Sequence, residues 1–171
     1  DCRELAQFCI DSKLPLVIDA GALDLVKGLR DYADAHSRSL SRAILTPHHG
    51  EAARLLTQLG SPRSRADIDA DPAASAKEVA LLTGAVILLK SSTTVCSYLH
   101  HDQGSRTQEI ISIPQETPWA GVAGSGDVLA GTLAGIAAGF QARAERRQGN
   151  PSISEAECAS LASLGAWVHA Q

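Results

Sequence analysis

The stretch VAGSGDVLAGTLAGIAAGF, residues 122–140, decides the fold that this sequence predicts. Gly124 and Gly126 allow the backbone to turn tightly and to approach a ligand closely. A run of small and apolar residues without charge follows Asp127, which predicts a buried helix that begins at the glycine turn. The N–H groups of Ser125, Gly126 and Asp127 would lie at the N-terminus of this helix, where an anion can bind. No Lys–Ser/Thr pair follows the glycines, so the stretch is not a Walker A loop.

Strands and helices alternate along the rest of the chain. Apolar runs predict buried strands at residues 16–18, 43–45 and 85–90, as expected in a parallel sheet covered on both faces. Two β-rich runs flank the predicted hairpin loop at residues 101–105. Helices are predicted at residues 2–10, from about residue 50, between Asp71 as N-cap and Gly84, and at residues 153–171. Residues 141–154 are charged and rich in turn residues, which predicts a surface loop.

Composition excludes several classes of protein. The 171 residues are sufficient for one domain with a core of its own, so we expect a single domain over residues 1–171. The net charge of −4 provides no basic surface for nucleic acid, and charges or glycines interrupt every apolar stretch before it could span a membrane. Four cysteines without a CxxC pair indicate reduced, structural thiols and a cytoplasmic protein.

Three more motifs lie just beyond predicted strands, where open α/β sheets bind ligands. They are IDAGAL at residues 18–23, LTPHHGEAARL at 45–55 and LKSSTT at 89–94. Together with AGSGDVLAG at residues 123–131, they resemble, in the same order, the motifs of the ADP- or ATP-dependent NAD(P)H-hydrate dehydratases of the ribokinase-like superfamily. The final GAWVHAQ is similar to another segment of that family.

The resemblance implies a ribokinase-like three-layer sandwich, with a mostly parallel sheet, helices on both faces and a β-hairpin at one edge. It covers the C-terminal portion of such a domain, whose N-terminal part would precede Asp1. It also implies a homo-oligomer, and a fused or separate NAD(P)HX epimerase as partner.

The activity implied by the resemblance is repair of a damaged cofactor. ADP, or ATP, with Mg²⁺ would phosphorylate the ring hydroxyl of (S)-NADHX or NADPHX, and loss of phosphate would restore NADH or NADPH, leaving AMP when ADP is used. A small-molecule kinase of the same superfamily, of the hydroxymethylpyrimidine or sugar type, is the alternative. A non-catalytic nucleotide-binding fragment is a second alternative.

In this reaction Asp127 fits a general base that takes the proton of the attacking hydroxyl and contacts the substrate. The N–H groups of Ser125 and Gly126 would stabilise charge on the transferring phosphoryl group. A carboxylate that only caps its helix is the alternative. We favour the base, because a cap does not require the glycines at positions 124 and 126.

The other motifs provide binding residues under the same resemblance. His48 would bind substrate, although a surface histidine in a turn is the simpler alternative. The nucleotide would lie along Lys90, Ser91, Ser92, Thr93 and Thr94, together with Ser125 and Gly126. Asp19 and Glu51 are candidates for holding metal, but the first could be an ordinary acid at a strand end and the second a helix cap. His49 and Trp119 receive no assigned role.

Overall fold

A five-stranded mixed sheet forms the centre of the protein, in a computed structural model that describes residues 1–102, 105–114, 122–148 and 153–171. The strands lie in chain order and are β1 (Leu16–Ile18), β2 (Ala43–Leu45), β3 (Val86–Leu89), β4 (Thr93–Asp102) and β5 (Ser105–Pro114). β1, β2 and β3 pair in parallel, whereas β4 pairs antiparallel with both β3 and β5. The expected α/β class, with parallel strands and a hairpin at the sheet edge, is confirmed.

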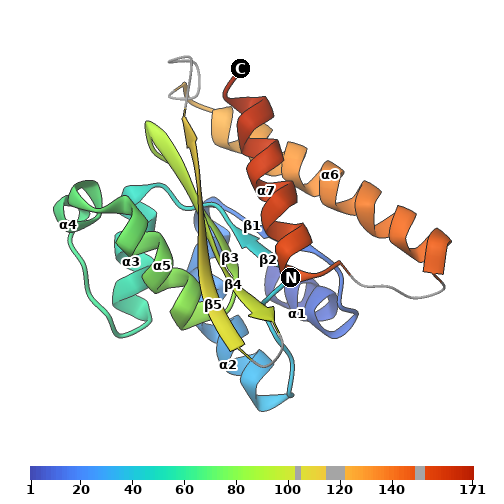
Figure 1. Ribbon diagram of the computed structural model, residues 1–171. Coiled ribbons are helices and arrows are strands. Elements are labelled where there is room, and N and C mark those ends of the chain that lie inside the picture. The colour runs from blue at the N-terminus through green and yellow to red at the C-terminus, as the bar shows by residue number, and fades with distance from the viewer. Residues whose placement is uncertain (103–104, 115–121, 149–152) are drawn as a thin grey trace.

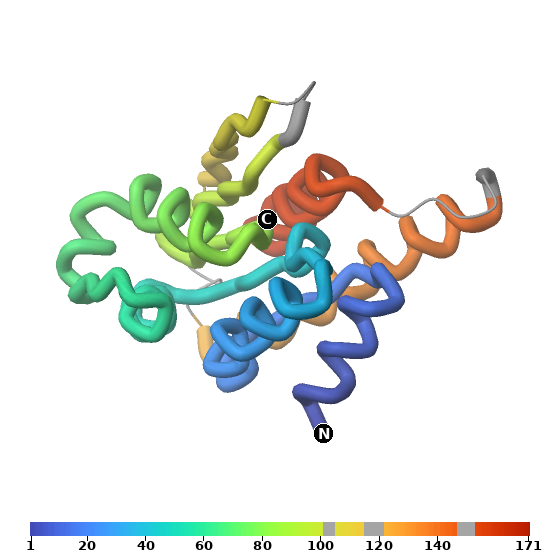
Figure 2. The backbone as a smooth tube through the Cα atoms, turned by 90° about the horizontal axis from the view of Figure 1, so that it is seen from below, coloured from blue at the N-terminus to red at the C-terminus, as the bar shows by residue number. Residues whose placement is uncertain are grey.

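Helices cover both faces of this sheet (Figure 1). Helices α6 (Ser125–Gln148) and α7 (Glu155–His169) lie together against one face. The other face is covered by α1 (Cys2–Asp11), α2 (Val26–Ala35), α3 (His49–Gln58), α4 (Arg65–Ala70) and α5 (Pro72–Thr83). A short 3₁₀ helix, η1 (Ala20–Leu25), follows β1 directly. The view from below in Figure 2 shows α6 and α7 side by side, in orange and red.

Burial on both faces of the sheet explains why the short strands are continuous apolar runs in the sequence. Ile44 of β2 packs into the cluster under α6 and α7, whereas Leu45 packs into the cluster on the opposite face. In β3, Val86 and Leu88 likewise face α6 and α7, whereas Ile87 and Leu89 face the other layer. Successive side chains of a strand point to opposite faces, so a strand covered on both sides needs apolar residues at every position.

The predicted helix signals are confirmed at α5. The Asp71 carboxylate accepts a 2.9 Å hydrogen bond from the N–H of Ala74, and Pro72 occupies the first helical position. Gly84 ends the helix with a φ of 69°, a left-handed conformation that glycine adopts without strain. These three residues set both ends of the helix that leads into β3.

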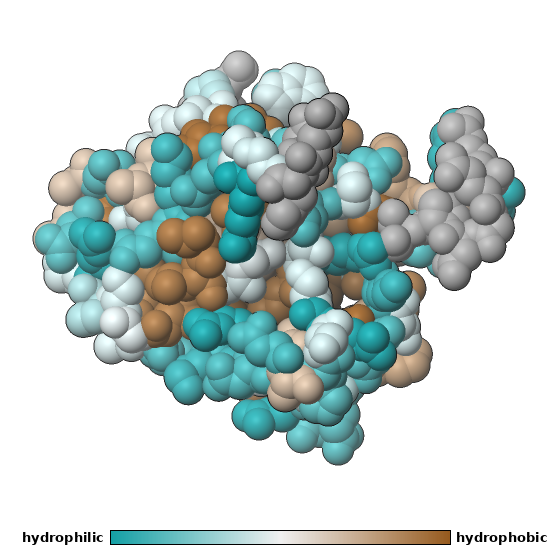
Figure 3. All heavy atoms as spheres, turned by 60° about the horizontal axis from the view of Figure 1, so that its bottom comes forward, coloured by the Kyte–Doolittle hydropathy of each residue, from teal (hydrophilic) through white to brown (hydrophobic). Residues whose placement is uncertain are grey.

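Helix α6 differs from expectation in two ways. It continues to Gln148, so the prediction of a loop from residue 141 was wrong, because Ala, Arg, Glu and Gln are strong helix formers. The helix is also not buried all round, since Val128 and Phe140 are 62% and 49% exposed. Only one side of α6 packs on the sheet and α7, and no described residue covers its outer side. The face shown in Figure 3 likewise has hydrophobic patches between hydrophilic residues.

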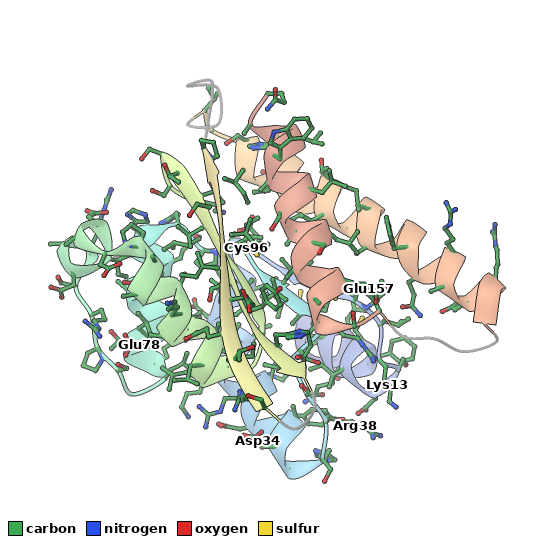
Figure 4. The ribbon with its side chains drawn as sticks, in the orientation of Figure 1. Lys13, Asp34, Arg38, Glu78, Cys96 and Glu157 are labelled. Atoms are coloured by element: carbon green, nitrogen blue, oxygen red, sulfur yellow. The ribbon has the colours of Figure 1, made fainter. Side chains whose placement is uncertain are left out.

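All four cysteines are free thiols. Burial raises the pKa of both Cys96, labelled in Figure 4, and Cys158 to about 11. These two thiols stay protonated at neutral pH, which agrees with the expected structural role. No helix in the described part of the chain has a stretch long and apolar enough to cross a membrane.

Candidate functional site

A hollow of about 650 Å³ lies beyond the carboxyl ends of the parallel strands, where the chain enters η1, α3 and β4 and where α6 begins. Carboxyl ends of parallel strands meet at one edge of a sheet, which explains why motifs far apart in sequence converge there. The predicted site residues that line this hollow are Asp19, His48, Lys90, Ser91, Ser92, Ser125, Gly126 and Asp127.

Other predicted residues are not among those that line the hollow. Thr93 and Thr94 open β4, and Thr94 is buried with its hydroxyl 3.4 Å from the carbonyl oxygen of Ser91. The carboxylate of Glu51 accepts a 2.9 Å bond from the N–H of His48 as part of a helix cap. Trp119 lies outside the described residues. The nucleotide-binding roles of the two threonines therefore stay predictions.

An ion pair joins the strand ends at the floor of the site. Lys90 Nζ donates a 2.7 Å hydrogen bond to Asp19 Oδ1, which also accepts a 2.7 Å bond from the Thr46 hydroxyl. A Cβ atom at Gly126 would lie 3.4 Å from Lys90 Nζ and 3.6 Å from Asp19 Oδ2. The start of α6 therefore approaches this ion pair so closely that a Cβ atom at position 126 would be in van der Waals contact with both of its side chains.

Two backbone N–H groups at the start of α6 find no carbonyl acceptor in the described part of the chain. The N–H of Ser125 donates to the carbonyl of Val122 at 3.1 Å, and that of Val128 donates to the carbonyl of Gly124 at 3.2 Å. Neither Gly126 nor Asp127 donates its N–H to a carbonyl among the described residues. Gly124 has a φ of 88°, which explains the glycine before the helix. Of the three N–H groups predicted to bind an anion, those of residues 126 and 127 thus have no carbonyl acceptor among the described residues, whereas that of Ser125 donates to Val122.

The carboxylate of Asp127 is not engaged by any residue that the structure describes. Asp127 is the third residue of α6 and lies within its first turn, whereas a capping residue precedes the helix. Within the described part of the chain, its side chain has no hydrogen-bond or ion-pair partner, and the residue lines the hollow. A free carboxylate beside two free amides can accept a proton next to a bound anion, which a helix cap could not do.

His48 is the N-cap of α3 and is held in one tautomer. Its Nδ1 accepts hydrogen bonds from the N–H groups of Gly50, at 3.0 Å, and of Glu51, at 3.3 Å. The proton of the neutral ring is therefore assigned to Nε2, which lies 3.6 Å from Glu51 Oε1. His48 is thus more than a surface histidine, because it caps α3 and lines the hollow with an N–H donor available.

The carboxylates of the hollow fit a magnesium ion that arrives with a nucleotide. The described residues contain no group of three or more His, Cys, Asp or Glu side chains that could hold a metal. Mg²⁺ usually binds through one or two carboxylates together with substrate phosphates and water. Asp19 and Asp127 both line the hollow, and Asp19 Oδ2 makes no hydrogen bond within the described chain. Glu51 is already engaged in its helix cap.

A second hollow of about 500 Å³ adjoins the first and was not predicted from the sequence. The two hollows share His48, Lys90, Ser91 and Ser92. The second adds His49 and Arg65, and no carboxylate is among the described residues that line it. Asp69, outside the lining, contacts His49 Nδ1 and lies 3.8 Å from Arg65. Arg65 opens a short helix that the sequence reading missed, and an exposed arginine gives no signal by itself.

Cationic residues also line a further hollow of about 300 Å³, but the role of its arginines is structural. Lys13, Arg38 and Arg42 line it at the amino ends of the strands, and the first two are labelled near the bottom of Figure 4. The Arg42 guanidinium donates to the carbonyls of Lys13 and Ile153, and Arg38 pairs with Asp11 at 3.2 Å. The two arginines hold chain segments together at the end of the sheet away from Asp127.

Comparison with known proteins gives concordant matches. A family model described as NAD(P)H-hydrate dehydratase matches residues 1–171. The chain is 34% identical over 159 residues to an ADP-dependent (S)-NAD(P)H-hydrate dehydratase of Neisseria meningitidis, covering 91% of this chain and 43% of that relative. It is 38% identical over 131 residues to a bifunctional NAD(P)H-hydrate repair enzyme of Leishmania infantum, covering 72% of this chain and 21% of the relative. The chain therefore spans less than half the length of these curated relatives.

Solved structures share the fold. A ribokinase-like superfamily protein of Enterococcus faecalis aligns with a TM-score of 0.57 and 22% identity, over 98% of this chain and 48% of that one. An ADP/ATP-dependent NAD(P)H-hydrate dehydratase of Bacillus subtilis aligns with a TM-score of 0.54 and 23% identity, over 91% of this chain and 44% of that one. The expected ribokinase-like fold is confirmed.

Proposed function

Because the chain belongs to the NAD(P)H-hydrate dehydratase family, we propose that it carries the active site for ADP-dependent dehydration of (S)-NADHX and (S)-NADPHX. The observation that carries the proposal is the free carboxylate of Asp127 beside the free amides of residues 126 and 127. The Neisseria relative is named as ADP-dependent, and the Bacillus structure was co-crystallised with ATP and Mg²⁺. ADP is therefore the first phosphoryl donor to test, and ATP the second.

The reaction divides into a transfer and an elimination. The ring hydroxyl oxygen attacks the terminal phosphorus of ADP, its proton passes to Asp127, and the bond from phosphorus to the AMP oxygen breaks. The ring carbon–oxygen bond then breaks, phosphate leaves with the electron pair, and the neighbouring ring carbon loses a proton. The products are the dihydronicotinamide, AMP and phosphate. The amides of residues 126 and 127 would bind the phosphoryl oxygens as their charge rises.

The cationic side chains would hold the phosphates of both substrates. Lys90 lines both hollows, and its charge is already oriented by Asp19. The second hollow adds Arg65 and no carboxylate, which suits the diphosphate of a nucleotide or dinucleotide. His48 offers its Nε2–H at the junction between the hollows. Bound Mg²⁺ would neutralise phosphate charge, with Asp19 Oδ2 as the candidate ligand.

Partners and location remain predictions. The Leishmania relative is named bifunctional, which is consistent with an NAD(P)HX epimerase as fused or separate partner. A homo-oligomer and a cytoplasmic location are expected from the family resemblance and from the reduced cysteines. The extent of the domain, residues 1–171, is likewise proposed.

A small-molecule kinase is the second candidate, because the same carboxylate and amides would serve any attacking hydroxyl. The kinase would leave a stable phosphorylated product, whereas the dehydratase releases phosphate and restores the dihydronicotinamide chromophore. A nucleotide-binding fragment without catalysis would do neither.

The deciding experiment gives the full-length gene product NADHX, ADP and Mg²⁺ and follows the return of dihydronicotinamide absorbance. We expect recovery with the wild type and a loss of about 10²–10⁴-fold in kcat for Asp127→Asn, with an unchanged melting temperature because the carboxylate has no partner. Phosphate release is measured in parallel. Absence of recovery with both ADP and ATP would reject the dehydratase and direct the screen to kinase substrates.

A further inference from the structure

The last turn of α7 is bonded to the first residue of α6. His169 Nε2 lies 2.8 Å from the carbonyl oxygen of Ser125, although the two residues are 44 positions apart in sequence. A carbonyl oxygen only accepts hydrogen bonds, so the ring donates and carries its proton on Nε2. Figure 1 shows the end of α7 beside the start of α6. His169 does not itself line the hollow.

The accepting carbonyl belongs to the same planar peptide unit as the N–H of Gly126. Within a trans peptide the C=O and the N–H point in opposite directions, so a donor at the oxygen lies behind the N–H. Such a bond draws electron density toward the oxygen and makes the N–H a stronger donor, because linked hydrogen bonds polarise one another. The polarised N–H is one of the two free amides of the site.

The two helices pack closely against each other near this bond. A Cβ atom at Gly165, one turn before His169, would lie 2.5 Å from Leu133 Cδ2 of α6. The two helices therefore pack as closely as a glycine permits, and Leu133 is fully buried between them.

We propose that His169 is a positioning residue of the anion site, which fixes the peptide between residues 125 and 126 and strengthens the N–H of Gly126 toward a bound phosphoryl group. The assignment rests on the proposed function of that site. The proposal adds to the anion site a residue of the final helix, which touches neither the substrate nor the reacting atoms.

Two variants of the full-length protein separate positioning from simple structural support. His169→Leu removes the donor, whereas His169→Gln keeps an N–H donor at a similar reach. We expect kcat to fall about tenfold in the leucine variant, less than for outright loss of an oxyanion donor, and to return to within about threefold of wild type in the glutamine variant. The KM for NADHX should stay within about twofold in both.

A histidine elsewhere provides the matched control. His36 Nδ1 makes a bond of the same length, 2.8 Å, to the carbonyl of Tyr32 at the end of α2. His36→Leu should leave kcat unchanged, although it too removes a bond from a histidine to a carbonyl. Equal kcat values for His169→Leu and His169→Gln would overturn the proposal, whether both match the wild type or both fall with the melting temperature.

Binding of inorganic pyrophosphate, measured by calorimetry, tests the same residue without catalysis. We expect the wild type and His169→Gln to bind it alike and His169→Leu to bind it about fivefold more weakly, a difference of about 1 kcal/mol. If the wild type failed to restore NADHX but showed this binding pattern, the proposed reaction would fall and the role of His169 would stand. Identical pyrophosphate affinities in all three proteins would overturn that role.

Discussion

Lys90 Nζ and Asp19 Oδ1 form a 2.7 Å ion pair that ties the end of β3 to the end of β1, across the strand that lies between them. Their side chains are only 21% and 13% exposed. Lys90→Met would leave the Asp19 carboxylate with the Thr46 hydroxyl alone. We expect a stability loss of about 1–3 kcal/mol, because a charge in a partly buried site loses its partner. Urea denaturation measures it, and the KM for ADP should rise in the same variant.

Lys27→Met is the matched control for that prediction. Lys27 pairs with Asp31 at 3.4 Å within α2, and both side chains are more than half exposed. Exposed pairs of this kind contribute little to stability, so the denaturation midpoint should hardly move. Equal midpoints for the two methionine variants would contradict a stabilising role of Lys90 at the site.

Two glycines of α6 should respond oppositely to alanine. In Gly126→Ala the new methyl group would lie 3.4 Å from Lys90 Nζ, so we expect lower kcat with little change in stability, since the flexible lysine can move. In Gly131→Ala the methyl group meets no atom within 4 Å. That variant should keep its activity and gain about 0.5–1 kcal/mol, because alanine favours helix more than glycine does. Steady-state kinetics and thermal melting of both variants test this prediction. Equal kcat values for Gly126→Ala and Gly131→Ala would contradict a close approach of position 126 to Lys90.

Arg65→Gln tests the second hollow. The substitution removes a cation that lines the second hollow but not the first. We therefore expect a rise of about tenfold in the KM of one phosphate-bearing substrate, with kcat nearly unchanged. Varying ADP, NADHX and NADPHX in turn identifies which phosphate lies there. Arg63→Gln is the control, because Arg63 pairs with Glu78 at 2.9 Å and does not line the hollow. Unchanged KM values for all three substrates would remove Arg65 from the site.

The start of α7 predicts a dependence of stability on pH. The pKa of Glu157 is lowered because the backbone N–H and then the hydroxyl of Ser154 donate to its carboxylate. A lowered folded-state pKa stabilises the protein above the ordinary glutamate value of 4.5, and this stabilisation disappears as pH falls through the folded-state pKa. Ser154→Ala should therefore cost about 1 kcal/mol at pH 7 and less in acid.

Melting curves of that variant at neutral and acidic pH provide the check. Ser160→Ala, in the same helix, removes a hydroxyl whose one bond to a described residue is to the Ala156 carbonyl. Its difference from the wild type should be the same at both pH values. A deficit of Ser154→Ala that persisted unchanged in acid would show that the carboxylate is not involved.

Local sequence signals were sufficient for much of the fold. The apolar runs of β1 and β2 predicted both strands to the residue, and Asp71, Pro72 and Gly84 bracketed α5. The signals failed for α6, whose charged last two turns read as a loop. A Gln141–Glu145 hydrogen bond of 2.8 Å supports the helix there. Such a pair, four positions apart, is harder to recognise in a sequence than the charged composition that favours a loop.

The site was predictable where a motif follows a strand and unpredictable where partners come from elsewhere. Asp19, His48 and Lys90 follow three parallel strands, so their convergence follows from topology. Arg65 gave no such signal, because tertiary packing alone brings it to the second hollow. The GAWVHAQ segment was noticed, but nothing in it indicated that His169 bonds to the Ser125 carbonyl.

Asp19 and Lys90 are 71 positions apart in the chain, and this separation has a kinetic consequence. Contacts between residues so distant in the chain form late, since the loop between them must close first. The antiparallel hairpin of β4 and β5 and the single helices need no such closure. Catalytic competence should therefore be the last property to return when the unfolded chain refolds, after most of the secondary structure is in place.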